Sequence, residues 1–152
     1  MPIHNLRGSE QAAITISGPE NAPYAIFLGR SGHNTVSIIN ARYITIQNLV
    51  LDGLNLPVDG VKCEGYADWS HDIILDGLQI VGISTKCPAW NWVIRNNRII
   101  GAGTGMYLGD SDGSAPFISG LIENNLITDT HGYNLQIKHQ QARPKIAGIT
   151  NR

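Results

Sequence analysis

The sequence predicts an all-β chain that winds into a right-handed parallel β-helix, a solenoid of about five to six coils. Two observations lead to this fold class. A six-residue aliphatic template occurs four times, beginning at residues 46, 75, 94 and 122, and no window has a convincing 3.6-residue period. The templates begin 29, 19 and 28 residues apart. Coils with strands of constant length and loops of variable length produce such irregular spacing.

The composition agrees with a surface of sheets and turns. Charged residues make up 15% of the 152 residues, against ~25% in typical soluble domains. At this length we expect one domain that spans residues 1–152. The formal net charge of −1 provides no general attraction to nucleic acid or to an anionic membrane surface. No apolar run approaches the roughly 18 residues that a membrane span needs. The N-terminus lacks the layout of a signal peptide, so the signal of an exported protein would have been removed or would lie outside this chain.

The expected strands follow one another along the chain. The stretches before the first template are rich in Val, Ile, Thr and Tyr, as strands prefer, and they cover residues 13–17, 24–27, 35–39 and 43–46. After each template comes a second stretch that largely alternates apolar and polar residues, the pattern of a half-buried strand. These second stretches, which mostly begin with Gly, cover residues 60–64, 82–86, 105–109 and 133–138.

Equivalent positions of the templates predict two interior ladders. The first consists of Ile46, Leu75, Ile94 and Ile122, and the second of Leu51, Ile80, Ile99 and Ile127. Burial stabilises the fold by about 1.5–3 kcal/mol for each aliphatic side chain. Asn96-Asn97 and Asn124-Asn125 are expected where the coil bends, because Asn tolerates the left-handed backbone region. Asp-Gly pairs leave a hairpin sandwich open as the alternative, but none clearly joins two alternating strands of equal length.

The repeated Ile-x-Asn-Asn-x-Ile signature, at Ile94–Ile99 and Ile122–Ile127, resembles the repeat of the pectate-lyase-like superfamily over roughly residues 36–139. Residues 8–20 are similar to the first coils of secreted β-helix proteins, including relatives of alginate and chondroitin lyases. The resemblance implies a carbohydrate-active protein that is extracellular or periplasmic. Because this fold also hosts polygalacturonases and phage tailspikes, it does not specify the reaction.

The chain ends depart from the family pattern. Family members usually carry an N-terminal cap, whereas this chain starts almost directly in a strand, and residues 142–152 offer no obvious capping helix. Solenoid ends need polar caps to cover the core and the strand edges. We therefore expect either a fragment of a longer β-helix or self-association through uncapped coil ends.

The Gly-led strands predict two outward columns of side chains. With Val61, Ile83, Met106 and Leu135 facing inward, the first column holds Lys62, Ser84, Tyr107 and Gln136, and the second holds Glu64, Lys86, Gly109 and Lys138. Parallel coils lie about 4.8 Å apart, close to the advance of one sugar ring. The columns could therefore hold an extended glycan, with substrate contacts expected from Lys62, Glu64, Lys86, Gln136 and His139. A solvated sheet face is the alternative.

The resemblance implies β-elimination on a uronate polymer, in which Lys or Arg acts as the base and Ca²⁺ or a second cation neutralises the carboxylate. Lys138 is the candidate base, because it lies beside His139 and in one column with Lys86, and nearby positive charge would favour its neutral amine. Tyr107 or His131 is the candidate proton donor. The alternative for Lys138 is an ordinary surface lysine, and no complete catalytic motif of the family matches.

Asp110 and Asp112 form the best metal-like stretch. Two carboxylates separated by one residue in a Gly/Ser-rich loop could converge on Ca²⁺ through oxygen ligands. Asp-Ser-Asp-Gly is equally good turn chemistry. The same pair could serve a glycoside hydrolase, which needs two carboxyl groups about 5–9.5 Å apart. The sequence pattern does not indicate where Asp52, Asp59 and Glu64 lie relative to this pair.

Other reactive side chains have structural interpretations. Cys63 and Cys87 both fall on inward positions and are expected to be buried, apolar thiols. The three tryptophans, Trp69, Trp90 and Trp92, could stack on sugar rings or pack across coil corners. The five histidines show no close pairing that would support zinc. Three function classes follow: a lyase on acidic polysaccharide, a glycan-binding module without catalysis, and a structural module that assembles through its ends.

Overall fold

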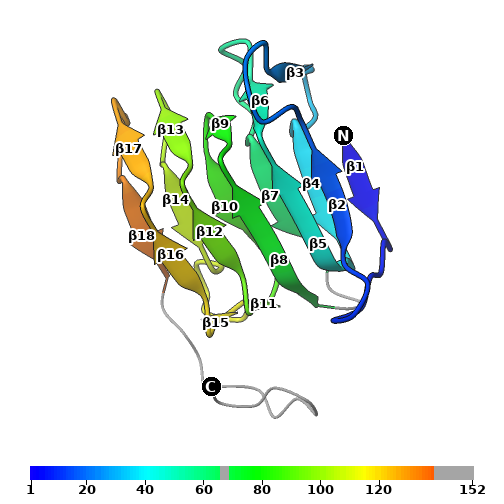
Figure 1. The fold of residues 1–152 in the computed structure, drawn as a ribbon. Coiled ribbons are helices and arrows are strands. Elements are labelled where there is room, and N and C mark those ends of the chain that lie inside the picture. Colours follow the sequence, from blue (N-terminus) through cyan, green and yellow to red (C-terminus); the bar gives the residue numbers. More distant parts are fainter. Residues whose placement is uncertain (66–68, 139–152) are drawn as a thin grey trace.

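The computed structural model describes residues 1–65 and 69–138, and these residues form an all-β structure (Figure 1). The strands are β1 (Pro2–His4), β2 (Ile14–Ser17), β3 (Ala25–Leu28), β4 (Val36–Ile39), β5 (Arg42–Gln47), β6 (Leu49–Asp52), β7 (Val61–Glu64), β8 (Ser70–Asp76), β9 (Gln79–Ile80), β10 (Ile83–Thr85), β11 (Ala89–Trp90), β12 (Val93–Arg95), β13 (Arg98–Ile100), β14 (Met106–Leu108), β15 (Phe117–Ile118), β16 (Leu121–Glu123), β17 (Leu126–Thr128) and β18 (Leu135–Ile137). No helix occurs among the described residues, and so none there has the length and apolarity to cross a membrane.

The strands belong to three parallel sheets. The first sheet has the order β1-β4-β7-β10-β14-β18, and the third has the order β17-β13-β9-β6-β3. The second sheet runs from β2 through β5 and β8 to two broken strands, β11 with β12 and β15 with β16. In the described part of the chain, each passage visits the first, second and third sheets in turn, so neighbouring strands come from successive turns (Figure 1). All strand pairings between named strands there are parallel, which confirms the predicted parallel arrangement over a hairpin sandwich.

Both predicted aliphatic ladders are present in the register of the sheets. Ile46, Leu75, Ile94 and Ile122 pair in succession across the second sheet. Leu51, Ile80, Ile99 and Ile127 pair across the third sheet. Six of these eight side chains are buried, and Ile122 and Ile127 of the last turn are half-buried against the core. The sequence repeat therefore forms the hydrophobic interior.

The corner between the second and third sheets repeats one backbone conformation. Asn48, Gly77, Asn96 and Asn124 occupy equivalent positions there, with φ of 55°, 62°, 56° and 53°. The neighbouring Asn97 is buried, and its Nδ2 donates to the carbonyl oxygen of Leu75 and to Oδ1 of Asn125. Its Oδ1 accepts from the backbone N–H of Leu78. The prediction that the Asn-Asn pairs stabilise bends is confirmed, because their amides satisfy backbone groups that the corner leaves unpaired.

The cysteines and one tryptophan lie in the interior. Cys63 and Cys87 are buried free thiols whose Sγ atoms are 2.7 Å apart. Burial, followed by the neighbouring Cys87 thiol, raises the pKa of Cys63 well above its ordinary value, which keeps this thiol protonated. Trp92 is fully buried, and its Nε1 donates to the carbonyl oxygen of Ser70 at 3.0 Å. Of the two uses left open for the tryptophans, Trp92 therefore packs in the core.

Two adjacent isoleucines on β13 test this arrangement. Ile99 is fully buried in the third-sheet ladder, whereas Ile100 faces outward and is half-buried. We expect Ile99→Ala to lower the free energy of unfolding by about 2–5 kcal/mol, because it leaves a cavity. Ile100→Ala should lower it by about 1 kcal/mol or less. Urea denaturation monitored by circular dichroism measures both values, and equal losses would contradict the inward assignment of Ile99.

Candidate functional site

The outer face of the first sheet carries the predicted columns. Ser84 pairs with Lys62 on one side and with Tyr107 on the other, and Tyr107 pairs with Gln136. Lys62, Tyr107 and Gln136 are half-buried, while Ser84 is only 4% exposed between its neighbours. The second column continues the same register, since the backbone N–H of Lys86 donates to the carbonyl oxygen of Cys63 and that of Lys138 to the carbonyl oxygen of Leu108.

Tyr107 is the centre of a cluster of polar side chains on this face. The Nζ atoms of Lys86 and Lys138 lie 4.0 and 5.2 Å from the centroid of its ring, within the range of cation–π attraction. Its hydroxyl is 2.5 Å from Oγ of Ser111. Nζ of Lys86 is also 3.4 Å from Oδ1 of Asp110. We call these five residues, Lys86, Tyr107, Asp110, Ser111 and Lys138, the lysine–tyrosine cluster.

The surroundings of Tyr107 alter its acidity. The hydrogen bond with Ser111 and the positive charges of Lys86 and Lys138 lower the pKa of Tyr107 below its ordinary value. These groups stabilise the phenolate more than the neutral phenol. A tyrosine whose pKa is shifted toward neutrality is better suited to general acid–base chemistry. The sequence pointed to Tyr107 as a proton donor, but Ser111 was missed because it was read only as part of a turn between two aspartates.

A second group of charges lies beside the cluster. Nζ of Lys62 is 3.9 Å from Oδ2 of Asp59 and 3.7 Å from Oε2 of Glu64. Nδ2 of Asn34 donates to Oε1 of Glu64 at 3.4 Å. Burial raises the pKa of Asp59, against the opposing charges of Lys62 and Lys86. The predicted contacts Lys62 and Glu64 are thus held together, and Asp59 joins them because it immediately precedes the Gly60 that leads into β7.

The loop with the two aspartates has the hydrogen bonds of a turn. Oδ1 of Asp112 accepts from the backbone N–H and the hydroxyl of Ser114, and these two bonds lower the pKa of Asp112. Oδ1 of Asp110 accepts from the N–H of Ser111 and faces Lys86. Within the described residues, no group of three His, Cys, Asp or Glu side chains is arranged to hold a metal. Calcium takes about 6–8 oxygen ligands, and Asp110 and Asp112 already accept hydrogen bonds within the turn, so the calcium role stays a prediction.

One further predicted site residue, His131, comes from a different part of the chain. His131 follows β17, where its backbone N–H donates to the carbonyl oxygen of Ala102. Its side chain is exposed, and among the residues that the structure describes none makes a hydrogen bond or ion pair with its ring. The geometry therefore provides no link between His131 and Tyr107. His139 lies outside the described residues.

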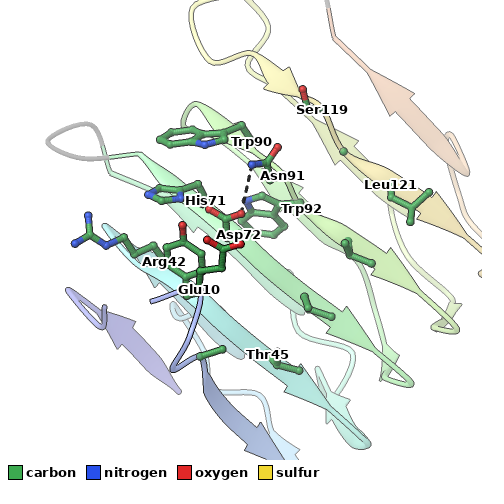
Figure 2. A pocket seen from close by; sticks show the side chains of 15 residues that line it. Glu10, Arg42, Thr45, His71, Asp72, Trp90, Asn91, Trp92, Ser119 and Leu121 are labelled. Atoms are coloured by element: carbon green, nitrogen blue, oxygen red, sulfur yellow. Dashed lines mark hydrogen bonds and ion pairs between the residues drawn. The ribbon is translucent and has the colours of Figure 1, made fainter. Parts of the chain in front are cut away.

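The outer face of the second sheet has a groove that the sequence did not predict. This second-sheet groove has a volume of about 1160 Å³ (Figure 2). Three columns of residues line it, each with one member from successive turns. One column contains Arg42, His71 and Trp90, the middle column contains Tyr43, Asp72, Asn91 and Ser119, and the third contains Thr45, Ile74, Val93 and Leu121.

The middle column gives the groove its shape. Tyr43, Asp72, Asn91 and Ser119 have φ of 52°, 52°, 55° and 53°, so the chain bends at the same position in four successive turns. The left-handed conformation is uncommon for residues other than Gly, and for a bulky residue such as Tyr43 it is an outlier. No sequence pattern would have indicated it there, because the aromatic side chain of Tyr43 favours an ordinary strand conformation.

Comparisons with protein-family models, with curated proteins and with solved structures found no match to this chain. No relative therefore provides roles for these side chains, and their chemistry rests on geometry. The first sheet brings together four predicted site residues, Lys86, Tyr107, Asp110 and Lys138, in one cluster that combines cations with a phenol of lowered pKa. The arrangement can bind an anionic group and exchange a proton next to it.

The acidity of Tyr107 is directly testable. We expect Ser111→Ala to raise the pKa of Tyr107 toward its ordinary value, because the largest contribution to the lowering is the hydrogen bond with Ser111. Ser114→Ala should leave it unchanged, since Ser114 bonds to Asp112 instead. Ultraviolet titration of tyrosinate, with Tyr107→Phe subtracted to isolate this residue among the five tyrosines, measures the pKa. An unchanged titration in Ser111→Ala would contradict the role of this hydrogen bond.

Proposed function

We propose that the three parallel sheets are the faces of one right-handed parallel β-helix domain of the pectate-lyase-like type. The passage of the chain through the three sheets in constant order supports this proposal. The buried amide of Asn97, bonded to Asn125 one turn further along, supports it as well. In such a fold, equivalent side chains stack about 4.8 Å apart.

Within this fold we propose a protein that acts on an acidic polysaccharide along the first sheet. The observation that most directly supports this proposal is that Lys86 and Lys138 both approach the ring of Tyr107. Two ammonium groups at one ring provide positive charge for a uronate carboxylate, and the outward column provides contacts to neighbouring sugars. A location outside the cytoplasm belongs to the same proposal, because polymers of this kind are encountered at and beyond the cell surface.

The proposed reaction is β-elimination. Ammonium groups of Lys86 and Lys138 neutralise the uronate carboxylate, which makes the proton at C5 more acidic. A base removes this proton, the C4–O bond breaks, a C4=C5 double bond forms, and the leaving oxygen takes up a proton. The lowered pKa of Tyr107 favours the phenolate as the base, and the phenol so formed can then protonate the leaving oxygen. Lys138, the base that the sequence suggested, would then act as a cation.

Glycan binding without catalysis uses the same face and is the second candidate. The ion pair of Lys86 with Asp110 favours it, because a lysine already paired with a carboxylate has less charge to offer to a reacting uronate. A binding module needs the lysines but does not need the phenol hydroxyl of Tyr107. The hydroxyl of Tyr107 therefore distinguishes the two candidates, because catalysis requires it and binding alone does not.

The test is release of unsaturated uronate, followed by ultraviolet absorbance. Pectate, alginate, chondroitin and hyaluronan are offered with calcium or with a chelator. We expect product from the wild type, a loss of about 10²–10⁴-fold in Tyr107→Phe because proton transfer is removed, and a raised KM in Lys86→Ala and Lys138→Ala. The rate should rise with pH as Tyr107 ionises, and in Ser111→Ala this rise should move to higher pH.

Arg98→Ala, which removes an exposed cation from the third sheet, is the charge-matched control and should keep full activity. Absence of product from every polymer, with a folded chain, would contradict the lyase proposal. Affinity electrophoresis in the same four polymers then tests the second candidate. Retardation that is retained in Tyr107→Phe and lost in Lys86→Ala would assign binding alone, and no retardation would contradict both candidates.

A further inference from the structure

We propose that the second-sheet groove is a separate binding site for a neutral, extended oligosaccharide. It lies on a different sheet from the lysine–tyrosine cluster, and it rests on different residues. The groove crosses the strands, so that a ligand lying in it meets one residue of each column per turn (Figure 2). The turns are spaced about 4.8 Å apart, close to the advance of one sugar ring, and this match favours an extended chain over a compact ligand.

An aromatic row forms one side of the groove. The rings of His71 and Trp90 are stacked, with centroids 4.2 Å apart and planes at 10°. Tyr43 meets His71 edge to face at 5.6 Å. Trp69, which is not among the residues that line the groove, meets Trp90 in the same way at 5.1 Å. Aromatic rings with a broad apolar face and a polar edge suit sites that are partly exposed to solvent. Because His71 and Trp90 cover one face of each other, a pyranose ring would contact the edges of this row with its apolar C–H groups while its hydroxyls reach the polar groups nearby.

The middle column provides the polar groups. Oδ2 of Asp72 is 2.5 Å from Nδ1 of His71, and its Oδ1 accepts from Nδ2 of Asn91 at 3.3 Å (Figure 2). These bonds orient the imidazole and the carboxylate without removing them from the surface, since the two side chains are 16% and 26% exposed. A carboxylate, an amide and a ring nitrogen at one place offer both acceptors and donors, which vicinal hydroxyls can pair with.

The charges of the groove decide between neutral and acidic glycans. Its charged lining residues are Glu10, Arg42 and Asp72, so that two carboxylates accompany one guanidinium. With a neutral His71, a uronate polymer would meet net negative charge here, whereas on the first sheet it meets Lys62, Lys86 and Lys138, whose charges are balanced in part by neighbouring carboxylates. The opposite side of the groove carries Ile74, Val93 and Leu121, which provide apolar contact and no charge. A neutral hexose chain suits both sides, because its hydroxyls can bond to the polar side and its C–H groups can contact the apolar side.

The backbone conformation of the middle column agrees with this role. Tyr43 and Ser119 hold a left-handed conformation that is uncommon for residues other than Gly, Asn and Asp, and such outliers gather at binding sites where the surrounding fold holds them in place. Without this bend, the first and third columns would lie on one flat face. Residues on both sides of the bend line the same groove, and a concave surface of this kind is what enclosure of a sugar chain requires.

The experiment measures the binding of neutral hexaoses, cellohexaose, mannohexaose and laminarihexaose, by isothermal titration calorimetry and tryptophan fluorescence, with hexagalacturonate as the acidic comparison. At least one neutral hexaose should bind and quench fluorescence. Trp90→Ala should weaken this binding by about tenfold through loss of aromatic contact area along the groove. Asp72→Asn, which tolerates the left-handed conformation and keeps the size of the side chain, should weaken it without unfolding the chain.

Arg98→Ala on the third sheet should leave the binding of neutral hexaoses unchanged. Tyr107→Phe and Lys86→Ala should also leave it unchanged, which separates this site from the first-sheet proposal. Circular dichroism of each variant shows that the sheets are intact. The proposal is overturned if no neutral hexaose binds, if binding survives both Trp90→Ala and Asp72→Asn, or if hexagalacturonate alone binds and depends on Lys86.

Discussion

Parallel, in-register pairing between successive turns is the constraint on which the rest of this structure depends. Each strand pairs with the strand one turn away, so a residue has the same surroundings as its equivalents before and after it. The aliphatic ladder through Ile46, Leu75 and Ile94 is one result. A shift of one residue in any strand would turn its ladder side chain outward and its polar neighbour inward, and the burial of this ladder therefore maintains the register.

The same register builds both candidate surfaces. On the first sheet it stacks Lys62, Ser84 and Tyr107, so that side chains distant in sequence become neighbours. On the second sheet it aligns left-handed residues, and a bend that would be local in a single strand becomes a groove across several. Repetition thus turns single-residue features into extended ones, which suits a polymeric ligand better than a small compact one.

The predictable part of the structure follows from periodicity. Alternation along the Gly-led strands was enough to place Lys86, Tyr107 and Lys138 on one face, because the two-residue period of a strand leaves little freedom. Contacts that depend on loop geometry were not predictable. Ser111 reaches the Tyr107 hydroxyl only because the turn from Asp110 to Gly113 folds back over the sheet. The stack of His71 on Trp90 depends on a pairing between residues 19 positions apart, which no local pattern indicates.

By itself the sequence determined that this protein is all-β, with parallel strands, aliphatic ladders and Asn at its bends, since burial and backbone propensity act position by position. Only the tertiary structure decided which polar side chains meet. The bend at Tyr43 and Asp72 and the approach of Lys86 and Lys138 to one ring arise from the stacking of turns. Such contacts join residues from different turns, and their geometry is defined only when the register is complete.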